Sequence, residues 1–233
     1  TVDTARNDIA IAAAAAEPTG GPLLTFVAPA PGGKVALRMY NPNDPYYGIS
    51  STIQAAFYAP AGGDAVATAN LRVAAGATLS IDDAAVETFG LEAGTAGVIR
   101  LTASNAMVIQ SRTTDAGGFA RVSLSSAAAP FLAEPSQLIG LAPTASLGFT
   151  AGPEGSTAAL TLLDAAGGSV ANAEVALEPN SNVESAAAER FQLETIPEDA
   201  SVSIEVVSGS MAAYARTAQP AGAALLQPAR AGV

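Results

Sequence analysis

Few side chains in this sequence are of the types that carry out catalysis. The 233 residues include no histidine, no cysteine and no tryptophan. Imidazole bases, thiol nucleophiles, disulfides and metal sites built from Cys or His are therefore excluded. Lys34, the only lysine, follows two glycines at the start of a predicted strand, where a solvated side chain is expected. We therefore predict no catalytic residues, no cofactor and no metal site, and a protein that is not an enzyme.

Two groups of oxygen-bearing side chains have the composition of a calcium site. Asp82 and Asp83 are adjacent, and Asn41, Asn43 and Asp44 lie within one short run. Such oxygens bind calcium, and paired carboxylates also serve glycosidases. However, Asp83 precedes three good helix formers, which predicts a helix N-cap. The run Asn-Pro-Asn-Asp-Pro is by itself sufficient for a turn. We favour the cap and the turn.

Two arginines and two tyrosines are candidate recognition groups. Arg112 and Arg216 occupy matching positions in two similar segments. We favour a conformational brace, against an Asp or a backbone carbonyl, over bidentate binding of a carboxylate partner. Tyr46 and Tyr47 lie between a proline and a glycine, which predicts an exposed loop. Aromatic rings stack on sugars and also pack at protein interfaces, so we predict a ligand loop at these two tyrosines and leave both kinds of ligand open.

The charge and the ends of the sequence restrict the partners and the location. Ten basic and 21 acidic residues give a net charge of −11, which repels phosphate backbones and anionic lipids. No apolar run approaches the roughly 18 residues that a membrane span requires. The sequence begins with Thr1, as in a processed mature protein or an artificially trimmed chain. We expect no nucleic-acid partner, no membrane insertion and a secreted, extracellular protein at the cell surface.

Apolar residues alternate with polar ones in short runs, which predicts β-strands. Examples are Ile53, Ala55 and Phe57 in the first half and Ala158, Leu160 and Leu162 in the second. Turns rich in Gly and Pro separate the runs, as is typical of an antiparallel β-sandwich.

The sequence repeats itself at an offset of about 104 residues. The repeated pairs are Met107-Val108-Ile109-Gln110-Ser111-Arg112-Thr113 with Met211-Ala212-Ala213-Tyr214-Ala215-Arg216-Thr217, Ser51-Thr52 with Ser156-Thr157, and Gly62-Gly63 with Gly167-Gly168. A short helical turn is repeated as well, with Asp83 and Ser185 as predicted N-caps and Phe89 and Phe191 folding onto a core. Such self-similarity indicates one fold used twice.

We therefore predict an all-β protein of two tandem antiparallel β-sandwich domains of similar fold, each with one short helical turn, plus an N-terminal extended arm. The predicted parts are an arm at 1–22, domains at 23–133 and 134–218, and a C-terminal tail at 219–233. The arm breaks at a Pro/Gly hinge that begins with Pro18. It has three interpretations: a frayed tail, an Ala-rich helix, or an exchanged strand that pairs with a sheet edge through Ile9, Ile11 and Ala13.

Several segments resemble a β-sandwich (Ig-like) module that recurs in tandem in secreted and cell-surface bacterial proteins. The segments are Lys34-Val35-Ala36-Leu37-Arg38-Met39-Tyr40-Asn41-Pro42, Leu79-Ser80-Ile81-Asp82-Asp83, Val98-Ile99-Arg100-Leu101-Thr102 and Ser111-Arg112-Thr113. The second half fits through Leu138 to Leu141 but has Ala151-Gly152-Pro153 in place of the Asn-Pro turn. The resemblance implies an accessory or structural role without catalytic residues.

The expected function is therefore that of a non-catalytic extracellular structural protein. It would be a homo-oligomeric or polymeric subunit of a cell-surface assembly or filament, held together by sheet edges and the arm. The alternative is a carbohydrate- or protein-binding accessory module of a secreted protein, with a surface glycan as the partner at Tyr46 and Tyr47.

Overall fold

The computed structural model of this chain consists mainly of antiparallel β-strands. It describes residues 2–3, 8–9, 19–26, 33–114, 120–124, 136–219, 222–226 and 229–230. Helices in these residues are short, so the predicted all-β class is confirmed. The chain divides into two compact units, one of Thr1–Ala59 with Asp64–Pro130 and one of Pro60–Gly63 with Phe131–Val233. Each unit is described by itself.

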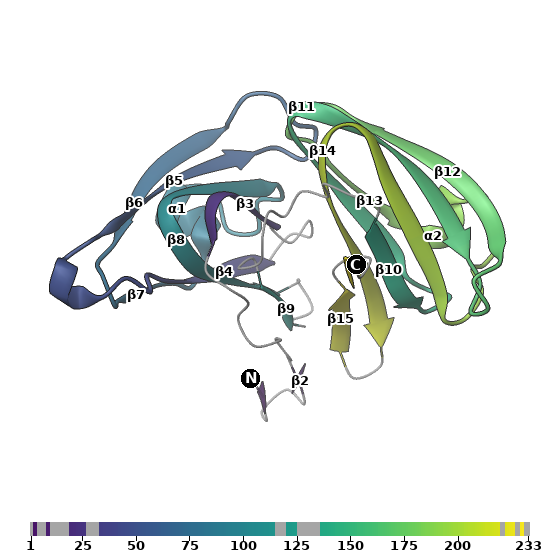
Figure 1. Cartoon of the computed structure of the whole chain (residues 1–233), viewed down its shortest axis with the longest axis horizontal. Coiled ribbons are helices and arrows are strands. Elements are labelled where there is room, and N and C mark those ends of the chain that lie inside the picture. Colours follow the sequence, from purple (N-terminus) through teal and green to yellow (C-terminus); the bar gives the residue numbers. More distant parts are fainter. Residues whose placement is uncertain are drawn as a thin grey trace. The chain divides into compact units, whose positions relative to one another are not determined.

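One long strand organises the sheet of the first unit. Its strands are β3 (Thr19–Phe26), β4 (Lys34–Tyr40), β5 (Ser51–Tyr58), β6 (Ala67–Val73), β7 (Thr78–Ile81), β8 (Val98–Thr114) and β9 (Ala120–Leu124). The first part of β8 pairs with β3 and β5, and its second part pairs with β4 and β9. β6 then pairs with β5, and β7 with β4. Figure 1 shows β8 curving as it passes between these partners.

The alternation seen in the sequence places one face of β4, β5 and β8 in the core of this unit. A single hydrophobic cluster takes in residues from both parts of the sheet. It includes Val35, Leu37, Met39, Ile53, Phe57, Ile99, Leu101, Met107 and Ile109. Burying each large apolar side chain contributes roughly 1.5–3 kcal/mol. Phe89, at the end of the short helix α1 (Ala84–Phe89), packs against the same cluster as predicted.

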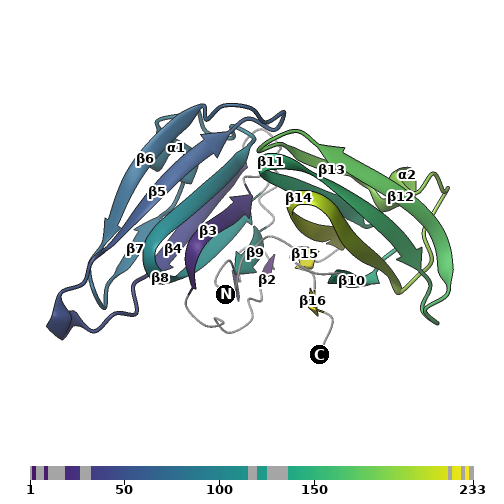
Figure 2. The same cartoon turned by 45° about the horizontal axis from the view of Figure 1, so that its top comes forward.

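The second unit has its own antiparallel sheet around β14. Its strands are β10 (Ser136–Leu141), β11 (Ser146–Leu163), β12 (Ser169–Leu177), β13 (Asn182–Ala186), β14 (Ala200–Gln219), β15 (Gly222–Leu226) and β16 (Ala229–Arg230). β11 lies between β12 and β14, as Figure 2 shows, and β10 and β15 also pair with β14. A second cluster, with Phe149, Leu160, Ile204 and Met211, forms the core.

The two pairing schemes correspond strand for strand. The two parts of β11 take the places of β4 and β5, with β12 for β6, β13 for β7 and β14 for β8. Even the register agrees, since Ala36 pairs with Arg112 and Ser146 with Arg216. One difference is the link between the two parts: a loop joins β4 to β5, whereas β11 continues as one strand through a register shift.

That register shift depends on glycine. Between Ala151 and Ser156 the pairing of β11 with β14 slips, and Gly155 and Gly209 have φ values of 76° and 70°. The backbone of Gly155 leaves no room for a Cβ at Gly209. L-residues with a Cβ disfavour positive φ, so both positions favour glycine sterically.

Several predictions at the ends of the chain differ from the structure. β3 begins at Thr19, so the last part of the predicted arm and of its Pro/Gly hinge is a strand of the first sheet. Most of the predicted tail is also ordered into strands: β15 and β16 pair with β14 and β10. The strands β8, β11 and β14 are longer than the short alternating runs of the sequence indicate, because each spans both parts of its sheet.

The second helical turn is not capped as predicted. Helix α2 (Ala187–Arg190) has Ala186 as its N-cap, without a side-chain hydrogen bond. Ser185 lies in β13 opposite Leu147, the position that Ile81 takes in the first unit. Ser185 is therefore a strand residue, and its buried Oγ has no hydrogen-bond partner among the described residues. Phe191, in contrast, is buried in the core as predicted.

Candidate functional site

The two tyrosines of the predicted ligand loop are highly exposed. They lie in a 3₁₀ turn, Pro45–Tyr47, between β4 and β5. Tyr46 is 88% exposed and Tyr47 71%, and their rings meet edge to face at 5.3 Å between centroids. The predicted exposure is confirmed. Two bare aromatic rings on one turn are an unusual surface feature, since such rings bury a large apolar area when they find a partner.

The turn that carries the tyrosines is fixed by its own ends. Oδ1 of Asp44 accepts a hydrogen bond from N of Tyr46 at 2.8 Å, which caps the turn. Pro45 supplies the helical φ at the first position, and Gly48 closes the turn with φ 64°. The predicted turn is thus confirmed, and Asp44 acts as its cap.

The buried side chain of Asn41 anchors this loop to the sheet. Its side chain is fully buried, and Nδ2 donates to O of Ile49 at 2.9 Å and to O of Val73 at 3.1 Å. Oδ1 accepts from N and Nδ2 of Asn43 at 3.1 and 2.8 Å. All hydrogen-bonding atoms of this amide are engaged within the protein, so Asn41 is an anchor for both ends of the loop.

The turn between β6 and β7 also holds the loop. N of Gly76 donates to O of Asn41 at 3.0 Å, and N of Asn41 donates to O of Ala77 at 3.1 Å. The ring of Pro45 packs so closely on Gly76 that a Cβ at that position would clash with it. The exposed tyrosines therefore project from a backbone that is held on two sides.

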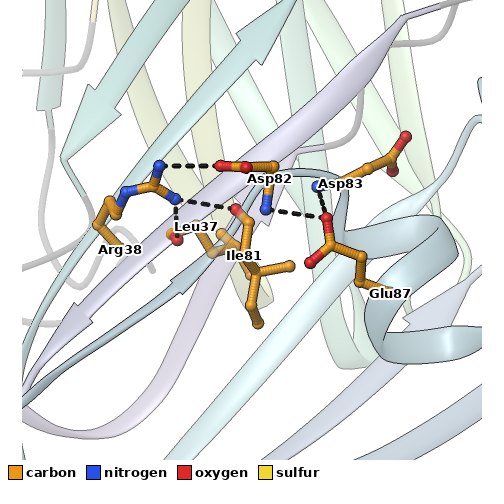
Figure 3. A network of polar contacts seen from close by, with 6 residues as sticks. All are labelled: Leu37, Arg38, Ile81, Asp82, Asp83 and Glu87. Atoms are coloured by element: carbon orange, nitrogen blue, oxygen red, sulfur yellow. Dashed lines mark hydrogen bonds and ion pairs between the residues drawn. The ribbon is translucent and has the colours of Figure 1, made fainter.

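The acidic pair at Asp82 and Asp83 belongs to a helix start (Figure 3). Oδ1 of Asp83 accepts from N of Val86 at 3.4 Å, which confirms the predicted N-cap. Oε1 of Glu87 returns to accept from N of Asp83 at 2.9 Å and from N of Asp82 at 3.2 Å. Asp82 forms an ion pair with Arg38 at 2.9 Å. In the described part of the chain, no group of three or more acidic side chains is placed to hold a metal ion.

The two repeated arginines lie at equivalent register positions. Arg112 is half-buried, and its Nε has no hydrogen-bond partner among the described residues. The side chain of Arg216 lies outside the part that the structure describes. The brace therefore stays a prediction for both.

The residues expected to make subunit contacts in the arm are placed only in part. Ile9 lies in strand β2 (Asp8–Ile9), which pairs with β1 (Val2–Asp3) so that Ile9 is opposite Val2. Ile11 and Ala13 lie outside the described residues. A role of all three in subunit contacts stays a prediction.

Among the described residues, β6 and β12 are two of the strands that pair with a neighbour on one side only. β6 pairs with β5 alone, and β12 pairs with β11 alone. Each contains a single charged residue, Arg72 in β6 and Glu174 in β12, and neither contains proline or lysine. Natural sheets usually protect such edges with charges, prolines or bulges, because an open edge is a template for another strand.

No protein-family model matches the sequence, and the searches of curated proteins and of solved structures returned no match. The described helices are too short to cross a bilayer.

The anchoring role of Asn41 was not predicted, although the sequence contains a signal for it. Val35, Leu37 and Met39 face the core at every second position, and Asn41 is the next residue in that series. A polar residue that continues an inward-facing series is expected to be buried with its hydrogen bonds satisfied.

We predict that Asn41→Ala lowers the free energy of unfolding by about 1–3 kcal/mol, because two backbone carbonyls lose their donor. Urea denaturation followed by tyrosine fluorescence measures this change. Asn43→Ala is the matched control and should cost less, since Asn43 is only half-buried. Equal effects of the two variants would contradict the anchoring role.

For the helix start, we predict that Asp83→Ala costs about 1 kcal/mol of stability, as loss of an N-cap does. Asp82→Ala removes only an ion pair whose side chains are 43% and 75% exposed, so its effect should stay below about 1 kcal/mol. Thermal unfolding monitored by circular dichroism compares the two. The order of the effects would be reversed if the ion pair, and not the cap, stabilised this corner.

Proposed function

We propose that the protein is a non-catalytic extracellular structural protein, a subunit of a cell-surface assembly or filament. The observation that carries this proposal is the free edge of β12: nine residues long, without proline, and with Glu174 as its single charge. A strand from another copy can extend the sheet there through backbone hydrogen bonds, which need no special side chains. We infer that the edge of β12 is the surface at which another copy of the chain binds.

The free edge of β6 gives such contacts a direction. Arg72 in β6 and Glu174 in β12 have opposite charges, so pairing of β6 from one copy with β12 from another places complementary charges in one interface. A contact between two different surfaces is heterologous, and a chain of such contacts grows into a filament unless it closes into a ring.

The same proposal includes the finer fold. We infer two tandem β-sandwich modules of the Ig-like kind found in secreted and cell-surface bacterial proteins. Their support is the matching strand order of the two sheets and the way that one hydrophobic cluster in each unit draws residues from both parts of the sheet. Modules of this kind present edges and loops for assembly, while the sheets supply stiffness.

A ligand-binding module is the second candidate function. The observation in its favour is the pair Tyr46 and Tyr47, which are 88% and 71% exposed on a turn that is held at both ends. A ligand that stacks on rigid rings orders few side chains on binding, so little affinity is lost to entropy. The ligand would be a surface glycan or a protein.

For the assembly, we predict that the double variant Asn172→Lys/Ala176→Lys prevents self-association through β12. Both residues are exposed on this edge strand, and lysines there disfavour the approach of a second strand. Light scattering and negative-stain electron microscopy should show large species for the unaltered protein. The apparent association constant of the variant should fall at least about tenfold.

The matched control is Ala159→Lys/Thr161→Lys on β11. These residues lie directly opposite Glu174 and Asn172, but β11 has partners on both sides. The control adds the same charge and should still assemble. A protein that is monomeric at all concentrations, or an edge variant that assembles as before, would refute the proposal.

For the second candidate, we predict that Tyr46→Ala/Tyr47→Ala removes binding to an immobilised glycan or protein ligand. Loss of a central aromatic contact typically costs about 2 kcal/mol or more, or roughly 30-fold in affinity. The melting temperature should not change, because both rings are exposed in the free protein. Retained binding by the double variant would rule out this loop, and Tyr40→Ala serves as a control at a less exposed tyrosine.

A further inference from the structure

Charge is divided unevenly between the two units. The first unit contains seven of the ten basic residues, and the second contains three. The acidic residues are nearly equal in number, with 10 in the first unit and 11 in the second. The second unit is therefore the more acidic one, and a contact with the first unit of another copy is electrostatically favoured over a contact between two second units.

Three basic side chains surround a small residue on the outward face of β4 and β8. Lys34, Ala36 and Arg38 alternate with the core residues of β4, and Arg112 on β8 is the register partner of Ala36. Diagonal neighbours on adjacent strands lie roughly 7–8 Å apart, so Arg112 is one diagonal away from both Lys34 and Arg38. We call this group of four residues the basic face.

The cations of the basic face differ in how they are paired. Arg38 forms the ion pair with Asp82 and donates to backbone carbonyl oxygens (Figure 3). Among the described residues, in contrast, no carboxylate pairs with Lys34 or Arg112. Lys34 is exposed, and Nε of Arg112 is buried without a hydrogen-bond partner. A partly buried cation without an acceptor is costly, so a carboxylate that a partner brings to Arg112 is favourable.

The acidic groups beside the basic face lie on the side of β7. Asp82 is paired with Arg38 there. Asp83 and Glu87 accept hydrogen bonds from backbone N–H groups at the start of α1. Arg112 is on β8, which lies on the other side of β4 from β7. An acidic partner therefore fits on the Arg112 side of the face.

A complementary surface lies on the outward face of the second sheet. The register places Glu174 of β12 and Glu205 of β14 on either side of Ala159 of β11. All three residues are exposed, and neither β11 nor β12 contains a basic residue. We call these three residues the acidic face. Its two carboxylates repel each other, so a cation placed on it is favoured.

Glu205 is the carboxylate of the acidic face that the edge contact leaves available. Glu174 lies on the edge strand β12, where the proposed assembly sets it beside Arg72 of another copy. Glu205 lies on the central strand β14. The neighbours Ala36 and Ala159 have small side chains, which leaves room for the two faces to approach each other.

We propose that the basic face of one copy binds the acidic face of a second copy, with Arg112 pairing with Glu205 and Lys34 adding a second positive charge. The contact rests on the proposed assembly, because a patch of this size binds weakly alone and gains strength when many aligned copies bind together. Side chains project out of the plane in which sheet edges pair. The face contact therefore joins filaments side by side, whereas the edge contact of β12 extends them.

The first test is sedimentation velocity of the full-length variants Arg112→Glu and Glu205→Arg, each alone and mixed in equal amounts. Each variant alone lacks one half of the contact, so the salt-sensitive part of its self-association should weaken at least about tenfold. The mixture combines the acidic face of one variant with the basic face of the other, and should associate within about threefold of the unaltered protein. A mixture that associates no better than the separate variants would overturn the proposal.

The matched control is Glu198→Arg, which makes the same change of charge outside the acidic face. Glu198 is exposed and precedes β14 in the chain. Its substitution should leave the association constant within about twofold. An equal loss in Glu198→Arg and Glu205→Arg would show that only the total charge of the chain matters, and would overturn the face contact.

Electron microscopy separates the face contact from the edge contact. Arg112→Glu and Glu205→Arg leave the edge of β12 unchanged, so single filaments should persist while side-by-side pairs disappear. Side-by-side pairs that persist in both variants would contradict the face contact. If the unaltered protein forms no filaments, the edge contact alone is refuted, and the mixing experiment at high protein concentration still decides the face contact.

Lys34→Glu keeps the test decisive if Arg112→Glu disturbs folding. Lys34 is exposed, so its substitution should leave the circular dichroism spectrum and the melting temperature unchanged. It should weaken the salt-sensitive association at least about threefold, and mixing with Glu205→Arg should restore it. A folded Lys34→Glu protein that associates like the unaltered protein would refute the proposed location.

Discussion

The constraint on which the rest of the structure depends is continuous pairing along one long strand in each unit. β8 and β14 each run through both parts of their sheet and have partners on both sides. Every other strand of these two sheets is placed by its register to this strand or to a direct neighbour of it. The core follows, because the same alternation faces inward along the whole length, from Ile99 to Ile109 in β8. A one-residue slip in either strand would turn its apolar face to solvent.

That constraint also explains where the two units differ. The central strands preserve the pairing scheme, so variation is confined to the links between their partners. In the first unit a loop joins β4 to β5, and the fully buried Asn41 satisfies the backbone carbonyls that the strand ends leave. In the second unit β11 passes through the same point as a strand, with glycines at the register shift. The two units therefore connect the two parts of the sheet differently. The first unit has an exposed loop with Tyr46 and Tyr47 at this point, and the second has a continuous strand.

The sequence alone was sufficient to predict the features that depend on residues close together along the chain. Alternation correctly assigned Ile53, Phe57, Leu160 and Leu162 to strand faces, and the turn chemistry located the N-cap at Asp83. It was insufficient at the chain ends, because the strands β15 and β16 form only when β14 and β10 provide partners. Ser185 illustrates the same limit. As a residue type it is a good cap, but the pairing of β13 with β11 places it within a strand.

The row of side chains across β5 could not be predicted from local patterns either, because its members are neighbours across strands and not along them. Ala56, Thr68 and Arg100 are brought into one row by the registers of β5 with β6 and β8. Strand edges and strand faces are perpendicular: backbone groups pair within the plane of a sheet, and side chains project out of it. The free edge of β6 and its exposed side chains Thr68 and Asn70 therefore point in perpendicular directions. A strand added beside β6 would extend the sheet within its own plane and leave these outward side chains uncovered.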